Sequence, residues 1–355
     1  MEKQITIYQI AKESGVSVST VSRVLNGGKN VAPGTLERVN QVIGKYHFSP
    51  SAVARAMAGQ HTGTIGMMMP DITNPYFSAL FLEIERYALS HHYSVMLCNT
   101  LYGGASHGVD SPIDEISYLK VMKEKMVDGV IITGGQLDME DTREEYIQAL
   151  NELNRSIPVV IIGQGVTGCE CLFVHRNLNG GVAALVQHLA ALGNKAIGFV
   201  GGEAGVRQTT ARLEAYRQTL LSIGLPYDLS LVALSDYYTA DGYSAMKQLL
   251  CREQLPQAVI AINDHVALGA IRAIYDRGLK VPEDIAVVSC DKFSGSEFHI
   301  PSLTTLDQQN DYLGRLSIQL LMGAIAGVGE NIEIRHTPQL IIQESCGVKL
   351  GVRRK

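Results

Sequence analysis

Residues 6–28 read TIYQIAKESGVSVSTVSRVLNGG, and this stretch decides the fold at the start of the chain. Thr6 and Gln9 have the spacing of a capping box, in which each side chain satisfies a free backbone N–H group at a helix start. Apolar residues recur on one helical face as far as Gly15, and glycine readily ends a helix in the left-handed conformation. The stretch therefore predicts a first helix between Thr6 and Gly15.

A second helix is predicted over residues 18–26, with Ser17 as its cap. Ala11, Gly15 and Val21 stand four and six residues apart. Two helices that cross at a three-residue turn need a small residue at the crossing, a glycine at the bend and a β-branched residue in the shared core. The spacing therefore indicates a helix-turn-helix, and an ordinary three-helix packing module is the alternative.

A third helix is predicted from Pro33, because proline suits a first helical turn. The charge of this region differs from that of the rest of the chain. Residues 1–60 contain seven Lys or Arg and three Glu, a net charge of +4. The whole chain carries −5, so the other 295 residues carry −9. A basic head on an acidic body favours a nucleic-acid contact made by the head alone.

The polar face of the second helix is rich in hydroxyl groups, where a merely solvated face favours Lys and Glu. Free N–H groups at its start attract a phosphate, short hydroxyl side chains can fix the register, and Arg23 has the fork that suits the guanine edge. The predicted DNA contacts of the first two helices are Thr6, Ile7, Ser17, Val18, Ser19, Thr20, Ser22, Arg23 and Asn26.

Residues 49–59, SPSAVARAMAG, predict a short hinge helix. A helix of about eight residues does not persist alone in water, and its apolar side, Val53 and Met57, has nothing to cover in a monomer. A partner copy and a DNA groove would supply the missing burial. The predicted DNA contacts of this segment are Ala54, Arg55 and Met57.

From residue 64 onward the sequence changes to apolar strands separated by helical stretches. One set of strand segments is TIGMMMP, SVMLCNT, DGVIITG and PVVIIG, and a second set is AIGFVGG, AVIAIND and IAVVSCD. Strands buried on both faces and joined by helices form parallel sheets, so the pattern predicts two Rossmann-like subdomains with a cleft between them. Ligands in such sheets bind beyond the carboxyl ends of the strands, which here present residues 71–77, Asn263, Asp264 and Asp291.

Together, the first helices, the hinge segment and the distal stretch INDHVALGAIRAIYDRGLKVPEDIAVVSCD resemble the lactose-repressor/galactose-repressor family of bacterial transcription regulators. The resemblance extends over nearly the whole chain. It implies an all-α helix-turn-helix domain and hinge helix, followed by an α/β periplasmic-binding-protein-like domain of two Rossmann-like subdomains. It also implies that paired hinge helices insert an apolar side chain, here Met57, into the minor groove.

The resemblance further implies domain boundaries. We expect the DNA-binding domain at 1–48, the hinge and linker at 49–62, and the effector-binding and dimerisation domain at 63–350. Within the last, the first subdomain is expected at about 63–162 and 292–323, and the second at about 163–291 and 324–350.

The resemblance implies that six residues line an effector pocket. They are Tyr76, Phe77, Arg212, Tyr237, Asn263 and Asp291. Each position has a structural alternative. The two neighbouring aromatics could be core residues, Arg212 could pair with Glu214 on its own helix, and Asp291 could cap the next helix.

The function predicted is that of a dimeric transcription regulator, a repressor of carbohydrate-utilisation genes, that binds a pseudo-palindromic DNA operator and a sugar-like effector. A corepressor-dependent repressor, or a dual activator and repressor that responds to a non-sugar metabolite or a sugar phosphate, stays open. An enzyme is disfavoured because the phosphate-loop, dinucleotide and serine-hydrolase motifs are absent from the sequence. We expect no cofactor, no metal at Cys169 and Cys171, no membrane contact and a cytoplasmic location.

Overall fold

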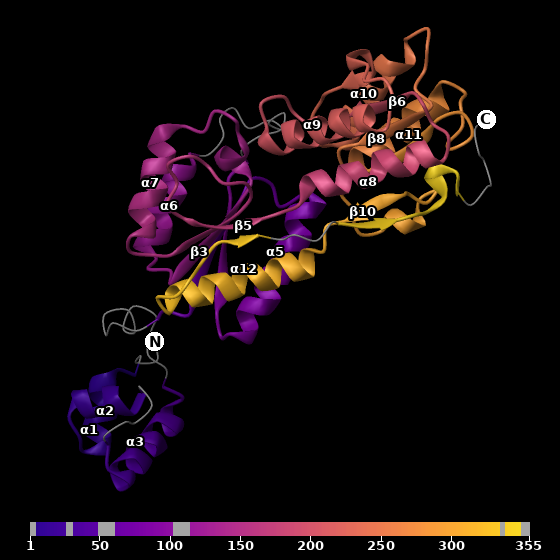
Figure 1. The fold of residues 1–355 in the computed structure, drawn as a ribbon. Coiled ribbons are helices and arrows are strands. Elements are labelled where there is room, and N and C mark those ends of the chain that lie inside the picture. Colours follow the sequence, from indigo (N-terminus) through magenta and orange to yellow (C-terminus); the bar gives the residue numbers. More distant parts are fainter. Residues whose placement is uncertain (1–4, 26–30, 49–60, 102–113, 334–337, 349–355) are drawn as a thin grey trace. The chain divides into compact units, whose positions relative to one another are not determined.

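A computed structural model of the chain describes residues 5–25, 31–48, 61–101, 114–333 and 338–348 (Figure 1). The chain divides into two compact units, residues 1–62 and residues 63–355. We call them the head and the body. The predicted hinge helix, residues 49–59, lies outside the described residues.

The head contains the three helices that the sequence predicts: α1 (Ile7–Ser14), α2 (Val18–Leu25) and α3 (Pro33–Tyr46). Gly15 ends α1 in the left-handed conformation, with φ of 65°. That conformation lets the chain turn within three residues before α2 begins. Ala11 and Val21 are buried in one small core, which also holds Ile10, Val24 and Val39. The small and β-branched residues therefore take the places that the helix-turn-helix spacing assigned to them.

The two predicted helix caps have different outcomes. Ser17 does cap α2, because its Oγ accepts a hydrogen bond from the Thr20 N–H at 3.2 Å. The capping box at Thr6 is wrong: Thr6 stands at the N-cap of α1, but its side chain makes no capping hydrogen bond. The Gln9 side chain contributes instead to lowering the pKa of Glu13, one turn further along the helix.

The first lobe of the body is built on a six-stranded sheet in the order β11-β5-β4-β3-β1-β2, and the pairing of all neighbours is parallel. Its strands are β1 (Thr64–Met69), β2 (Ser94–Asn99), β3 (Gly129–Thr133), β4 (Val159–Ile162), β5 (Leu172–His175) and β11 (Ile332–Glu333). Helices α5 (Pro75–Ser90) and α12 (Asn310–Ile325) cover one face, and α6 (Glu115–Glu124) and α7 (Glu144–Asn154) cover the other (Figure 1). Burial on both faces explains why these strands read as continuous apolar runs.

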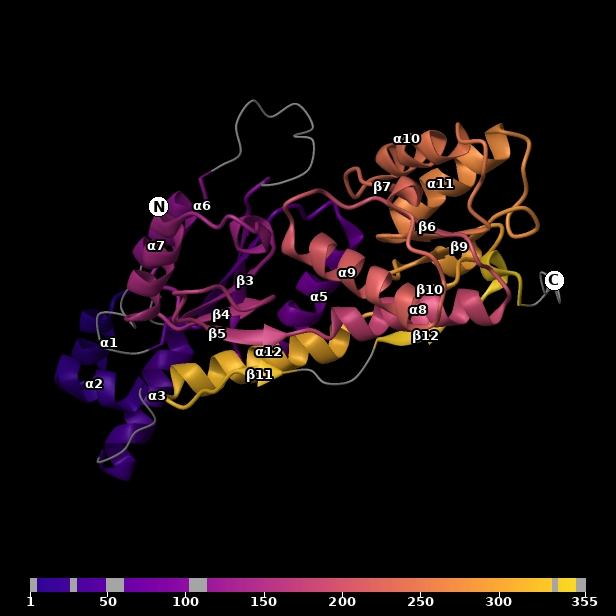
Figure 2. The same cartoon turned by 45° about the horizontal axis from the view of Figure 1, so that its top comes forward.

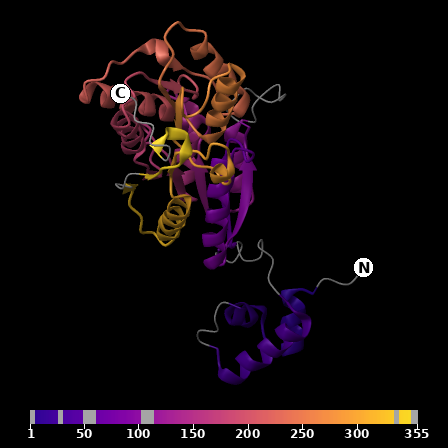
Figure 3. The same cartoon turned by 90° about the vertical axis from the view of Figure 1, so that its right-hand side faces the viewer.

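The second lobe has a four-stranded parallel sheet in the order β7-β6-β8-β9. Its strands are β6 (Ile197–Val200), β7 (Val232–Ala233), β8 (Ala258–Ala261) and β9 (Ala286–Ser289). Helices α8 (Leu178–Ala191) and α9 (Arg207–Ser222) lie on one side of the sheet, and α10 (Thr239–Leu250) and α11 (Asp264–Asp276) lie on the other (Figures 2 and 3). A short antiparallel pair, β10 (Thr305–Asp307) and β12 (Gln339–Ile341), joins this lobe. The 3₁₀ helices are η1 (Gly135–Asp138), η2 (Leu229–Leu231), η3 (Ser296–Phe298) and η4 (Glu344–Cys346).

All seven segments predicted as strands are strands, and the chain passes between the two lobes three times as expected. The predicted subdomain boundaries need correction. Strands β5 and β11 extend the first sheet, so the first lobe continues past residues 162 and 323. Residues 303–307, which were expected in the first subdomain, belong to the second, because Leu303 and Leu306 pack into its core and β10 pairs with β12.

Candidate functional site

The exposed face of α2 begins with three linked hydroxyl groups. Ser17 Oγ lies 2.8 Å from Ser19 Oγ and 2.9 Å from Thr20 Oγ1. Ser17 and Ser19 are exposed, and Arg23 is exposed in the last turn of the same helix. Hydroxyl groups at the start of a helix can exchange these mutual hydrogen bonds for bonds to phosphate oxygens.

The structure places the other predicted DNA contacts less uniformly. Thr6 is exposed, Thr20 and Ser22 are half-buried, and Ile7 and Val18 are half-buried against the core of the head. Asn26, Ala54, Arg55 and Met57 lie outside the described residues. Sequence reasoning passed over Tyr8, whose side chain on α1 is 72% exposed. The sequence did show an aromatic residue in the first turn of a predicted helix, and that feature could have drawn attention to Tyr8.

One cavity of about 800 Å³, counting the part open to solvent, lies between the two lobes of the body. It is surrounded by the residues that follow the carboxyl ends of strands β1, β3, β6, β7, β8 and β9, where open α/β sheets bind ligands. Its lining residues are Pro70, Asp71, Asn74, Tyr76, Phe77, Gly134, Gly135, Asp138, Met139, Glu203, Val206, Gln208, Arg212, Asp236, Tyr237, Tyr238, Asn263, Asp291 and Phe293. All six positions predicted for the effector pocket are among them.

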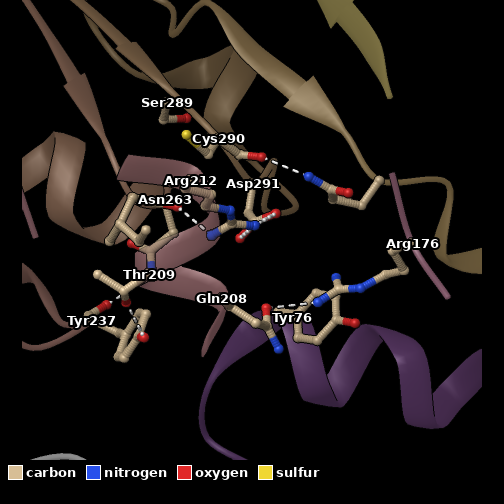
Figure 4. Close-up of polar contacts among 12 residues, drawn as sticks. Tyr76, Arg176, Gln208, Thr209, Arg212, Tyr237, Asn263, Ser289, Cys290 and Asp291 are labelled. Atoms are coloured by element: carbon tan, nitrogen blue, oxygen red, sulfur yellow. Dashed lines mark hydrogen bonds and ion pairs between the residues drawn. The ribbon is translucent and has the colours of Figure 1, made fainter. Parts of the chain in front are cut away.

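A buried ion pair, Arg212 with Asp291, lines this cavity (Figure 4). Arg212 Nη2 donates to both carboxylate oxygens of Asp291, at 2.9 and 2.8 Å, and Arg212 Nη1 donates to the Ile262 carbonyl at 3.2 Å. Burial opposes the charge of Arg212, but the neighbouring Asp291 outweighs that effect and raises the pKa of the guanidinium. The pair presents a cation and an anion together, which suits hydroxyl groups that both donate and accept.

The aromatic wall is held by hydrogen bonds of its own. The Asn263 Nδ2 donates to the Tyr237 carbonyl at 2.9 Å, and Asn263 Oδ1 accepts from the Val266 N–H at 2.9 Å at the start of α11. The Tyr237 hydroxyl lies 2.8 Å from Thr209 Oγ1, and burial raises the pKa of Tyr237 to about 12. Asn263 lines the cavity, and its two hydrogen bonds fix the position of Tyr237.

A second polar group, which draws residues from both lobes, was not among the predicted site residues. Gln208 Nε2 donates to Asp138 Oδ2 at 2.6 Å, and Gln208 Oε1 accepts from Arg176 Nη2 at 2.7 Å. The guanidinium of Arg176 lies 4.9 Å from the centroid of the Tyr76 ring. Burial raises the pKa of Asp138 to about 6. Asp138 follows strand β3, so the rule of strand ends could have found it.

The two lobes also contact each other directly beside the cavity. The Glu140 N–H donates to the Gly205 carbonyl at 2.8 Å, and Arg207 Nε donates to the Met139 carbonyl at 2.9 Å. On the other side, the Tyr238 hydroxyl donates to the Asp71 carboxylate. A ligand that changes the separation of the lobes must therefore break or tighten these contacts.

Behind the cavity wall, Glu115 is buried at the start of α6, and it accepts a hydrogen bond from the Gln136 N–H at 3.2 Å. Burial raises the pKa of Glu115 to about 7. This contact holds the η1 turn, which carries Asp138 into the cavity.

The structure also decides between the alternatives for the pocket residues. Pairing of Arg212 with Glu214 is wrong, because Glu214 pairs with Arg217 at 2.6 Å while Arg212 pairs with Asp291. The Asp291 side chain is therefore not a helix cap. Tyr76 and Phe77 are both core residues and pocket residues, since they pack with the core of the first lobe and also line the cavity. Asp264 differs from its neighbours, because it turns into the lobe and accepts from the Phe293 N–H at 2.9 Å.

Within the part of the chain that the structure describes, no cluster of three or more His, Cys, Asp or Glu residues is arranged to hold a metal ion. Among the same residues, no helix has the length and apolar character needed to cross a membrane.

Comparisons with known proteins agree with both parts of this description. The profile of "Bacterial regulatory proteins, lacI family" matches residues 6–51, and that of "Periplasmic binding protein-like domain" matches residues 186–346. The HTH-type transcriptional repressor PurR of Haemophilus influenzae is 33% identical over 344 residues, which cover 96% of this chain and 98% of that protein.

Two solved structures are similar over almost the full length. The lac repressor dimer bound to operator and the anti-inducer ONPF is 25% identical with a TM-score of 0.80, and the match covers 97% of this chain and 99% of that one. The complex of the transcriptional regulator CelR with cellobiose is 27% identical with a TM-score of 0.69, and the match covers 96% and 100%.

Proposed function

Because this chain belongs to the lacI family of bacterial regulatory proteins, whose members are DNA-binding transcriptional repressors rather than enzymes, we propose that a neutral, sugar-like effector in the cavity controls its operator affinity. The genes repressed would be those for carbohydrate utilisation. The observation that carries the proposal is the buried Arg212–Asp291 pair, set among aromatic rings at the strand ends.

The charge of the cavity supports a neutral ligand over a sugar phosphate. Of the described residues that line it, five are acidic and Arg212 is the basic one. Arg212 is already neutralised by Asp291 at 2.8 Å, so a phosphate would gain little attraction and would meet several carboxylates. Hydroxyl groups avoid this cost because they can accept from Arg212 and donate to Asp291 at once.

The aromatic residues support a ligand with flat or weakly polar faces. Tyr76 and Phe77 meet edge to face with ring centroids 5.1 Å apart, and Tyr237 and Phe293 also line the cavity. A sugar ring can stack on such surfaces through its C–H groups. A nucleobase is the second candidate, because its planar ring fits the same surfaces.

A homodimer is part of the proposal, because a pseudo-palindromic operator matches a two-fold protein. Large apolar side chains are exposed on the body, where a partner copy would bury them: Leu82 is 61%, Leu89 70%, Phe298 83% and Ile300 91% exposed. The effector would change the relative pose of the two lobes, and with it the spacing of the paired hinges. Residues 49–60 of those hinges lie outside the described part of the chain.

A thermal-shift screen of the full-length protein tests the effector class, because a ligand that binds only the folded state raises the melting temperature. The panel contains neutral mono- and disaccharides, the matching sugar phosphates, and free nucleobases. We expect a neutral sugar to raise the melting temperature, and Asp291→Ala to abolish that rise. Stabilisation by sugar phosphates or nucleobases alone would overturn the proposed class.

A further inference from the structure

Two of the six cysteines, Cys169 and Cys171, stand two residues apart in the loop between β4 and β5. All six cysteines are free thiols in this structure. Cys171 is buried, Cys169 is half-buried, and Glu170 between them is exposed. Both cysteines pack against the same core, which lies between the first sheet and helices α6 and α7. The two thiols therefore lie on one side of the chain, and the carboxylate between them faces solvent.

The backbone around the two thiols is held to α7 by two asparagines that lie one turn apart. Asn151 Nδ2 donates to the Gly168 carbonyl at 2.8 Å, and Asn151 Oδ1 accepts from the Glu170 N–H at 2.8 Å. Asn154 Nδ2 donates to the Glu170 carbonyl at 3.1 Å. These bonds fix the chain on both sides of Cys169. Cα atoms two residues apart are separated by at most about 7 Å, the upper end of the range that a disulfide spans.

The two thiols differ in their chemistry. The side chain of Cys171 holds the pKa of the Cys169 thiol below its usual range, although burial opposes that effect. Cys169 and burial together raise the pKa of Cys171. The more accessible cysteine is therefore the better thiolate, and a protonated thiol lies beside it. Two other cysteines differ from this pair, because burial raises the pKa of Cys98 to about 11 and that of Cys290 to about 12, and buried thiols of this kind are inert.

We propose that Cys169 and Cys171 form a redox-sensitive dithiol that a hydroperoxide oxidises to a disulfide, with Cys169 as the attacking thiol and Cys171 as the resolving thiol. An accessible, reactive thiol with a second thiol next to it is the usual arrangement of a redox-sensing pair. Neither cysteine lines the cavity between the lobes. The modification site is therefore separate from the effector site, and it does not depend on the effector class proposed above.

The oxidation takes place in two steps. The Cys169 thiolate attacks one peroxide oxygen, an S–O bond forms and the O–O bond breaks, which leaves a sulfenic acid and a hydroxide that takes up a proton. The Cys171 sulfur then attacks the sulfenic sulfur, the S–S bond forms, and the hydroxyl group leaves as water with the proton of the Cys171 thiol. The dithiol loses two electrons and two protons, and hydrogen peroxide becomes two water molecules. Thiol–disulfide exchange with a reducing dithiol reverses the oxidation.

The test exposes the reduced, full-length protein to a small excess of hydrogen peroxide, and then unfolds it, alkylates it with N-ethylmaleimide and digests it with trypsin. The tryptic peptide 156–176 contains both cysteines and none of the other four. By mass spectrometry we expect this peptide to be two hydrogen atoms lighter and unalkylated, and to take up two alkyl groups when dithiothreitol is added before the alkylation. Cys169 should be consumed roughly 10-fold faster than the exposed Cys251.

Three variants separate the roles of the thiols. Cys171→Ser should leave Cys169 as a sulfenic acid that dimedone traps, because the resolving thiol is absent. Cys169→Ser should leave the peptide unoxidised, because Cys171 is buried. Cys251→Ser is the matched control, and its disulfide should form at the same rate as that of the unaltered protein.

Two results with the unaltered protein overturn the proposal, so the decision does not depend on whether a variant folds. The first is a peptide 156–176 that still takes up two alkyl groups after peroxide has oxidised Cys251. The second is a disulfide that forms as fast in the urea-unfolded chain as in the folded protein, because the fold would then contribute nothing to the reactivity of the pair. Either result leaves the proposed effector function untouched.

Discussion

Breaking the Arg212–Asp291 pair gives the clearest test of how the cavity is built. The side chains are 3% and 12% exposed, so Asp291→Ala leaves the Arg212 guanidinium buried with a single described hydrogen bond, to the Ile262 carbonyl at 3.2 Å. Removal of one partner of a buried ion pair typically costs about 3–5 kcal/mol. Asp291→Ala should therefore lower the free energy of unfolding by about that amount.

Substitution of Arg212, alone or together with Asp291, makes this prediction more specific. Arg212→Met should cost less, because the Asp291 carboxylate is the more exposed partner. The double variant should be no less stable than Asp291→Ala alone, since neither charge is then left unpaired. Breaking the exposed Glu214–Arg217 pair on the same helix is the matched control, and it should cost about 0–1 kcal/mol.

The assay is urea unfolding of the full-length protein, followed by far-ultraviolet circular dichroism. DNA affinity of each variant is measured in parallel by fluorescence anisotropy. Asp291→Ala should retain its operator affinity and lose its response to the effector. Additive losses of stability in the double variant would refute the reasoning, because they would mean that the two side chains stabilise the body independently.

Three further predictions concern other parts of the molecule. Burial raises the pKa of Glu115 from 4.5 to about 7, so its ionisation destabilises the fold increasingly as pH rises through that interval. Glu115→Gln should therefore stabilise the protein by up to about 3 kcal/mol at pH 8 and by little at pH 4.5, and equal melting-temperature shifts at both pH values would contradict this. Arg23→Ala should relax base preference at one position of each half-site at a cost of about 1–3 kcal/mol, measured by binding to operators altered at each position; unchanged specificity would remove its assigned role. Ser17→Ala should lower the stability of the head by about 1 kcal/mol through loss of the α2 cap, as measured by calorimetry, while Ser17→Asn should restore it.

The sequence predicted the main architecture because its signals were long or chemically specific. The apolar runs, the Gly15 turn and the Ala11–Val21 spacing each point to one local structure. Strands β7 and β11 have two residues each, and β10 and β12 have three, so they carry no periodicity that a sequence could display. Their existence depends on edges offered by strands already in place, and for that reason the later subdomain boundaries, between residues 292 and 350, were misplaced.

The residues of the candidate site likewise include some that the sequence predicted and some that it did not. The rule of strand ends predicted Asp71, Tyr76, Phe77, Asn263 and Asp291, which line the cavity, and the resemblance to known regulators added Arg212 and Tyr237. Arg176 escaped both, because it lies after a short strand and reaches the cavity only through the Gln208 amide. The Thr6 capping box failed because the Thr6 side chain makes no capping hydrogen bond, and the Gln9 side chain interacts with Glu13, which the two-residue pattern does not include.

The most direct test of the central claim is the affinity of the full-length protein for its operator with and without the neutral sugar found in the thermal-shift screen. A pseudo-palindromic operator is first selected from a random duplex library. We expect the sugar to change the dissociation constant about 5- to 150-fold in one direction, the range typical of such coupling, and to have no effect on Asp291→Ala. A protein that binds no duplex at low salt, or one whose operator affinity is the same with the cavity saturated as with it empty, would contradict the account.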